Sequence, residues 1–199
     1  MGKSVFLGCL VLVLVGVLVV GGMAVGAYNR LNTADQGVNG TWADVENNYQ
    51  RRADLVPNLV ETVKGAAAFE KSTLEAVIQA RASATQVRLD PNSLKDPAAF
   101  AKFQSAQDQL SGALSRLLVT VEQYPELKAN QNFRDLQVQL EGTENRIAVS
   151  RNRFNEATQS YNTLRKSFPT VIVASFAGFK ERPYFKSAAG AERAPAVKF

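Results

Sequence analysis

The longest repeat in this chain reads FRDLQVQLEGTENRIAVSRNRFNEATQSYNTLRKSF and occupies residues 133–168. Within it, mostly apolar residues recur in steps of three and four, which is the spacing of one face of an α-helix. We call such a row of residues a stripe. The stripe consists of Phe133, Leu136, Leu140, Thr143, Ile147, Ser150, Phe154, Ala157, Tyr161, Leu164 and Phe168. Small residues at 143, 150 and 157 would let a neighbouring helix approach closely. A helix of this length is not stable alone in water, so it requires partner helices.

Two of these partner helices are expected in the first half of the chain. A stripe of the same spacing covers residues 42–66, where Pro57 should kink the helix or begin a new one. A second helix is expected over about residues 73–87, with Ser72 and Glu75 as its capping box. Its buried side would carry Leu74, Val77 and Ile78.

A further helix is expected immediately after Asp96 and Pro97, which have the chemistry of an N-cap and a first-turn proline. Its stripe runs from Phe100 to Tyr124, where Pro125 should end it and begin the next helix. The connections between these helices are short, which favours antiparallel neighbours. An up-and-down antiparallel bundle satisfies all of these patterns.

The N-terminal part of the chain has the character of a membrane helix. Residues 5–27 contain no charged side chain and would span roughly 34 Å as a helix, enough for a hydrocarbon core of about 30 Å. A cleavable signal peptide is the alternative, because Gly22, Ala24 and Gly26 are small. The run is longer than the apolar segment of about 7–15 residues typical of signal peptides, so we expect a retained anchor.

Three further features of the N-terminal region bear on the membrane. Cys9 lies in a lipobox-like run but opens the apolar stretch instead of closing it, so we interpret it as an ordinary membrane-helix residue. Gly22 and Gly26 form a pair at the spacing that can seat a second helix. The amino terminus and Lys3 precede the run, and Arg30 follows it with acidic residues beyond. The positive-inside rule slightly favours a cytoplasmic amino terminus with the domain exported.

The expected fold is therefore all-α, with an N-terminal transmembrane helix followed by an elongated antiparallel up-and-down bundle of about four helices. We divide the chain into an anchor (residues 1–27), a helical bundle domain (28–180) joined to the anchor through residues 28–39, and a flexible basic tail (181–199).

The composition excludes several classes of enzyme. The 199 residues include no histidine and one cysteine, so a histidine-dependent nucleophile, a histidine-ligated metal and an intrachain disulfide are all excluded. The sequence also contains no phosphate-binding glycine loop and no nucleophile elbow. We therefore expect no catalytic, cofactor-binding or metal-ligating residues and no cofactor.

Two polar groups remain as candidates for chemistry. Arg52 falls on an apolar stripe, where it could contact an anionic ligand, lie at the rim of the bundle, or pair with a carboxylate such as Glu144. Glu141 and Glu144 share a helix face and could form an all-carboxylate metal site, although ordinary surface charge is the better interpretation.

Residues 176–186 mix aromatic and basic side chains, so they could bind a partner, lie on a membrane surface, or fold back over the bundle end.

Several segments resemble the LemA family of bacterial proteins. They are YQRRADLVPNLVETVKG (residues 49–65), LEGTENRIA (140–148), RNRFN (151–155), and FAGF followed by PYF (176–179 and 183–185). The resemblance implies a bacterial membrane-anchored helical bundle with no established catalytic activity. It also implies an association with envelope proteases, phosphatase-like envelope modules or, in one branch, membrane organelles.

These observations predict a non-enzymatic, single-pass protein of the bacterial inner membrane with its domain in the periplasm. It would act as a scaffold or oligomeric interaction module, with membrane lipid, copies of itself and other envelope proteins as partners. A membrane-remodelling or membrane-organising factor and an adaptor for envelope protease systems are the alternatives. Nucleic acid is not an expected partner, because no motif for it is present and the net charge of +5 is mostly dispersed.

Overall fold

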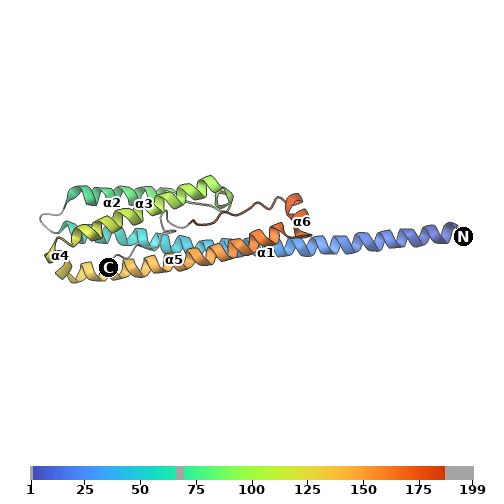
Figure 1. The fold of residues 1–199 in the computed structure, drawn as a ribbon, viewed down its shortest axis with the longest axis horizontal. Helices are drawn as coiled ribbons and strands as arrows, with labels where there is room; N and C mark the ends of the chain where they lie inside the picture. The colour runs from blue at the N-terminus through green and yellow to red at the C-terminus, as the bar shows by residue number, and fades with distance from the viewer. Residues whose placement is uncertain (1, 66–69, 187–199) are drawn as a thin grey trace, which may run out of the picture.

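The computed structural model describes residues 2–65 and 70–186, which form an elongated helical rod (Figure 1). In order, these residues form α1 (Gly2–Lys64), α2 (Lys71–Gln86), the short 3-10 helix η1 (Ser93–Lys95), α3 (Pro97–Val121), α4 (Pro125–Ala129), α5 (Gln131–Lys166) and α6 (Thr170–Phe176). Helices α1, α2, α3 and α5 alternate in direction along the rod (Figure 1). Helix α4 lies at one end of the bundle and α6 lies beside α1 at the other, where the N-terminal part of α1 extends beyond the bundle (Figure 1). The predicted all-α bundle is confirmed.

Helix α1 passes from the apolar N-terminal run into the bundle without a break (Figure 1). Residues 28–39, through which the anchor was expected to join the bundle, are helical throughout. The segment contains no proline, and Leu31 and Val38 are completely buried within it. This burial offsets the low helix propensity of its asparagines and of Gly37.

Pro57 lies inside α1 and does not end the helix. Proline has no N–H, so the carbonyl of Ala53 loses the donor it would normally find four residues later. The Nε of Arg81, on α2, donates to that carbonyl at 2.8 Å. A side chain from a neighbouring helix thus supplies the missing hydrogen bond.

Other helix ends agree in part with the sequence prediction. Asp96 caps α3 as expected, since its Oδ1 accepts a hydrogen bond from the Ala98 N–H at 3.0 Å. The capping box predicted for α2 is wrong: Glu70 is the N-cap, and its carboxylate accepts the Ser72 hydroxyl at 2.6 Å. Ile78, expected to be buried, is exposed. Helix α3 ends at Val121, before the predicted Tyr124.

The most extensive helix pairing in the bundle is between α1 and α5. Thr143 and Ser150 are buried on α5, and Ala157 is partly buried, at the positions where small side chains were predicted. Small residues there let the two helix backbones approach.

The core has two parts along the rod. The half next to α4 is largely aliphatic, with residues such as Leu59, Leu110 and Leu117 at its centre. The half next to the N-terminal run is rich in aromatic residues, including Trp42, Phe100, Phe103, Phe154, Tyr161 and Phe185. Both parts are built on the same long helices, α1, α3 and α5.

After α6, residues 179–186 turn back along the bundle, and we call this segment the C-terminal strap. Arg182 and Phe185 are buried, so the flexible tail expected from residue 181 is wrong for residues 181–186. The rest of that predicted tail, 187–199, lies outside the described residues.

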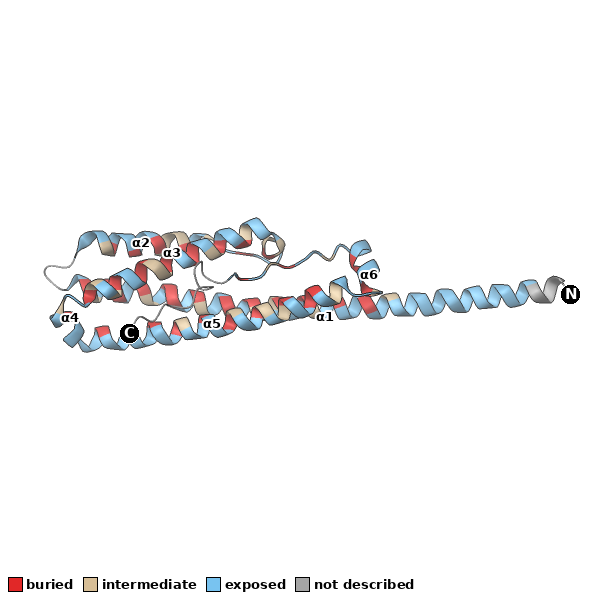
Figure 2. Ribbon diagram, viewed as in Figure 1, coloured by how far each residue is buried: buried red, intermediate tan, exposed pale blue. Residues whose placement is uncertain are grey.

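The N-terminal part of α1 is long and apolar enough to cross a membrane, with a mean hydropathy of 2.8 over its most apolar window. None of that window is buried against the rest of the molecule, as Figure 2 shows by the uniformly exposed colour of this part of α1. A soluble core helix of the same composition would be buried. The exposed apolar surface therefore indicates a lipid-facing segment.

Candidate functional site

Arg52 lies at the centre of a polar network inside the bundle, although α1 places it on an otherwise apolar stripe. Its residue surface is 1% exposed. One terminal nitrogen, Nη1, donates to the Ser111 hydroxyl at 2.6 Å and to Glu144 Oε1 at 2.7 Å. The other, Nη2, donates to the side chain of Gln107 at 2.7 Å and to its backbone carbonyl at 3.2 Å. Arg52 thereby links α1, α3 and α5.

The carboxylates proposed for a metal site are not brought together in that role. Glu144 pairs with Arg52, as one of the predicted alternatives requires. Glu141 accepts a hydrogen bond from Gln137 Nε2 at 2.9 Å on the exposed side of α5. Within the described parts of the chain, no three carboxylate, histidine or cysteine side chains are grouped to hold a metal ion.

A second buried arginine, Arg182, fixes the C-terminal strap to α1. Its Nε and Nη2 donate to Asp35 Oδ1 at 3.0 and 2.7 Å, and Nη2 also donates to Asn39 Oδ1 at 2.9 Å. Asp35 has a second cation nearby, with Lys95 Nζ 3.6 Å from its Oδ2. Both members of the Arg182–Asp35 pair are buried, which makes the removal of either one costly.

Two asparagines of α5, seven residues apart, hold the backbone of the strap. The Asn162 side chain accepts a hydrogen bond from the Arg182 backbone N–H at 3.0 Å and donates one to the Arg182 carbonyl at 2.9 Å. The Asn155 side chain does the same for Phe185, at 2.9 and 3.1 Å. A side-chain amide carries both a donor and an acceptor, so each asparagine satisfies both backbone groups of one strap residue.

The side chain of Phe185 enters the aromatic part of the core. Its ring lies 4.8 Å from the ring of Phe100 and 5.5 Å from that of Phe154, measured between centroids. Arg151 also stacks its guanidinium over Phe185 at 4.7 Å. The strap is therefore an integral layer of this half of the bundle.

The hydroxyl of Tyr161 on α5 donates to the carbonyl of Lys180 at 2.8 Å. Burial raises the pKa of Tyr161 to about 12; the negative charge of Asp35 adds to this effect, and Arg182 opposes it. Burial also raises the pKa of Tyr49, with the nearby guanidiniums of Arg151 and Arg52 opposing. Both phenols are therefore neutral over the physiological range.

An open groove of about 1060 Å³ lies between α2, α3 and the strap. Its helical walls combine small residues, among them Ala80, Ala101 and Gly112, with larger ones such as Gln104 and Gln109. A Cβ atom at Gly112 would meet no other heavy atom within 4 Å, so the surface is open at that point. Asp108 and Arg116 line the same groove, one four residues before Gly112 and the other four residues after it.

A model of the LemA family matches residues 41–199, which include α2 to α6, the strap and most of the bundle part of α1. The chain belongs to the LemA family. The resemblance to the LemA family that the sequence segments indicated is thereby confirmed.

Among curated relatives, this LemA-family chain is similar to the magnetosome protein MamQ of Magnetospirillum gryphiswaldense, with 28% identity over 174 residues. That alignment covers 79% of this chain and 64% of MamQ. Magnetosome protein MamQ 1 of Paramagnetospirillum magneticum is 27% identical, covering 80% of this chain and 64% of the relative. Protein LemA of Metamycoplasma hominis is 24% identical over 150 residues, covering 75% of this chain and 64% of the relative. The chain thus spans less than two thirds of each relative's length.

The strap contacts of this LemA-family protein were missed by the sequence reasoning. The signal for Asp35 was present, because the stripe of α1 extends upstream as Leu31, Asp35, Val38 and Trp42, with the same steps of three and four. Asp35 is therefore a charge on an apolar stripe, as Arg52 is. Nothing in helical periodicity identifies Arg182, since the strap is not a helix.

Proposed function

We propose that this protein is a membrane-anchored scaffold whose rod-shaped domain self-associates through the groove on α3. The membrane-associated, non-enzymatic character is supported by LemA-family membership and by the relatives MamQ and LemA. The observation that carries the oligomeric role is the arrangement of charge and small side chains around Gly112.

The groove is self-complementary under a two-fold axis. If α3 of one copy crosses α3 of another in antiparallel fashion at Gly112, Asp108 of each copy lies opposite Arg116 of the other. Two copies then form two identical ion pairs, as an isologous dimer interface requires. Gly112 lets the two helix backbones approach at the crossing point, because it carries no side chain.

The test exchanges these charges in the full chain. Asp108→Arg places like charges opposite each other, so the variant should be monomeric in detergent at concentrations where the natural chain is a dimer. Arg116→Asp should have the same effect. The double variant Asp108→Arg/Arg116→Asp regenerates both ion pairs and should restore the dimer. Light scattering coupled to size-exclusion chromatography gives the mass of each species.

A matched pair of glycine substitutions controls for effects on folding. Gly112→Leu fills the groove, whereas Gly142→Leu adds the same side chain to an exposed position of α5, also with no heavy atom within 4 Å. Only Gly112→Leu should abolish the dimer. A monomeric natural chain at micromolar concentration, or a dimer unaffected by Asp108→Arg, overturns the proposal.

We further propose that the protein resides in the bacterial inner membrane with its domain in the periplasm. The positive charges around the anchor support this orientation, since the amino terminus and Lys3 precede the apolar run and Arg30 alone directly follows it. A phosphatase reporter fused after Phe199 should be active, since that enzyme requires an exported location. Activity of a cytoplasm-specific reporter at the same position contradicts the orientation.

A further inference from the structure

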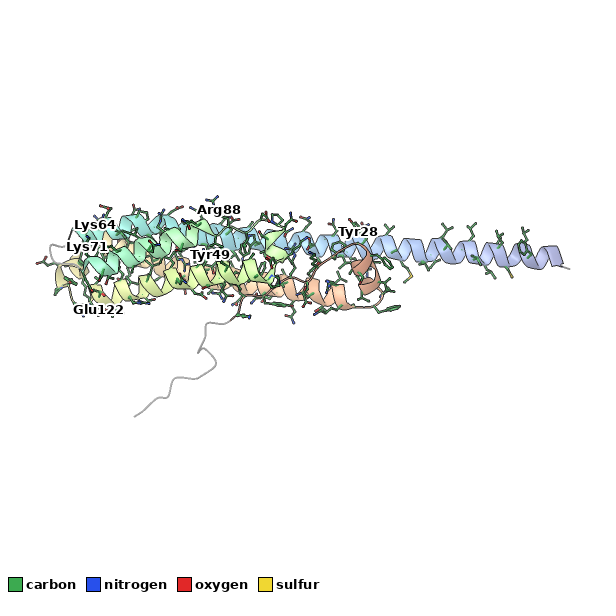
Figure 3. The ribbon with its side chains drawn as sticks, turned by 90° about the horizontal axis from the view of Figure 1, so that it is seen from above. Tyr28, Tyr49, Lys64, Lys71, Arg88 and Glu122 are labelled. Atoms are coloured by element: carbon green, nitrogen blue, oxygen red, sulfur yellow. The ribbon has the colours of Figure 1, made fainter. Side chains whose placement is uncertain are left out.

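Helix α6 lies against the end of the membrane anchor. Residues 6–23 of α1 are exposed, and burial begins at Ala24, which is half-buried, and Ala27, which is buried. The ring of Tyr28 contacts that of Phe179, just after α6, with 5.6 Å between centroids. Figure 3 shows the labelled Tyr28 beside α6, at the point where the N-terminal part of α1 extends beyond the bundle.

Two opposite faces of the α6 segment differ in burial. Thr170 and Ala174 are buried against the molecule. Ile172 and Phe176 are four residues apart within α6, so they share one helical face, whereas Phe168 lies in the turn just before α6. The side chains of Phe168, Ile172 and Phe176 are 82%, 49% and 90% exposed, respectively, within the described structure. Large exposed apolar side chains on α6 and in the turn before it give this end of the bundle a surface that water solvates poorly.

The end of α6 is fixed firmly against the bundle. Gly178 adopts a φ of 74°, a conformation that favours glycine, and the N–H of Phe179 donates to the Ala174 carbonyl at 3.0 Å. This is the hydrogen bond of a Schellman motif, which closes a helix C-terminus. Arg165 Nε also donates to the Phe179 carbonyl at 2.8 Å. The exposed apolar face is thus presented in one orientation.

The depth of α6 relative to a bilayer follows from the length of the anchor. The uncharged run of residues 5–27 spans roughly 34 Å, slightly more than a hydrocarbon core of about 30 Å. Its last turn therefore lies at the boundary between acyl chains and headgroups. Since α6 packs against that same turn, it lies at the same depth.

We infer that α6 is a second membrane contact, in which Phe168, Ile172 and Phe176 insert among the lipids beside the anchor. The exposed Arg30 follows the end of the anchor and the exposed Lys180 follows α6, where cationic side chains are attracted to anionic headgroups. The inference concerns a lipid-binding surface and is independent of the proposed dimer. With both contacts in place, the domain is held to the bilayer at two points and cannot swivel freely about the anchor.

The experiment measures the depth of single labels in the full chain. The one natural cysteine is replaced by Cys9→Ser, and single cysteines are introduced as Phe168→Cys or Phe176→Cys and labelled with a small fluorophore. The matched control is Val138→Cys, an exposed apolar position on α5 towards the far end of the rod. The protein is reconstituted into phosphatidylcholine–phosphatidylglycerol vesicles, some containing nitroxide-bearing lipids.

Labels at 168 and 176 should be quenched strongly by the lipid nitroxides and protected from iodide in the water. The depth obtained should be roughly 5–10 Å into the boundary between headgroups and acyl chains. The label at 138 should show the reverse, with quenching by iodide only. If the label at 176 behaves as the label at 138 does, the face is in water and the inference is overturned. Protection from both quenchers also overturns it, because a protein surface then covers α6.

Discussion

Two buried arginines carry much of the specificity of this fold at the scale of single residues. Arg52 joins three helices through a carboxylate, an amide and a hydroxyl, whereas Arg182 joins the C-terminal strap to α1 through Asp35. The two pairs differ in their surroundings. The Glu144 side chain is 44% exposed, but the Asp35 side chain is only 9% exposed.

That difference predicts unequal costs for removing the two arginines. Arg182→Met leaves a buried carboxylate with Lys95 as its remaining cation, so the free energy of unfolding should fall by about 3 kcal/mol. Arg52→Met leaves Glu144 accessible to water and should cost only about 1–2 kcal/mol. Urea denaturation followed by circular dichroism measures both. Adding Asp35→Asn to Arg182→Met should recover part of the loss, and equal losses for the two single variants would contradict the prediction.

The phenol of Tyr161 predicts a stability change in alkaline solution. Its pKa in the folded protein, about 12, lies above the ordinary value of 10.0, so the folded state holds the phenol proton more tightly. The resulting stabilisation is complete below pH 10 and is lost as the pH rises towards 12. Between these values, Tyr161→Phe should lose stability less steeply than the natural chain. Parallel curves for the two proteins would show that Tyr161 makes no such contribution.

At the scale of helices, the bundle part of α1 shows how one element tolerates unfavourable residues through its neighbours. Pro57 deprives the Ala53 carbonyl of its helical donor, and Arg81 on α2 replaces that donor. The proline and the arginine are therefore coupled, although they belong to different helices.

Arg81→Leu should leave the Ala53 carbonyl without a donor and lower the free energy of unfolding by about 1–3 kcal/mol. Pro57→Ala restores a backbone N–H at the correct spacing. Pro57→Ala should therefore raise the free energy of unfolding more in the Arg81→Leu variant than it does in the natural chain. A double-mutant cycle with strictly additive free energies would disprove the coupling.

The helices themselves were predictable because their stripes reflect burial directly. The small residues at 143, 150 and 157 even indicated where a neighbour packs closely. The stripe also extends upstream through Leu31 and Val38, and the burial of these two residues offsets the low helix propensity of the asparagines and Gly37 in this part of α1. The strap, by contrast, was missed. An extended segment held by Asn155 and Asn162 has no repeat of its own, and its partners are distant in sequence.

At the scale of the whole molecule, the anchor and the domain share one helix but not one core. The two core clusters begin at Leu31, and no earlier described residue belongs to either cluster. The stability of the domain therefore depends mainly on contacts outside the apolar run, to which the run adds the burial of Ala27 at its end.

A chain lacking residues 1–27 should accordingly fold. We expect a helical circular dichroism spectrum and a single cooperative thermal transition, since the aliphatic and aromatic parts of the core are both retained. The control is the full chain in detergent. A broad transition without cooperativity in the truncated chain would mean that the anchor contributes to folding.

The unbroken course of α1 also makes the molecule a lever. The 37 residues from Tyr28 to Lys64 extend roughly 55 Å beyond the anchor at the helical rise. Transmembrane helices tilt by about 20° on average, and the tilt varies with bilayer thickness. Because no hinge separates the anchor from the rod, a change of about 20° at the membrane would carry the far tip sideways by roughly 19 Å. Local bilayer thickness is thereby converted into the position of α4, where a neighbouring molecule would encounter it.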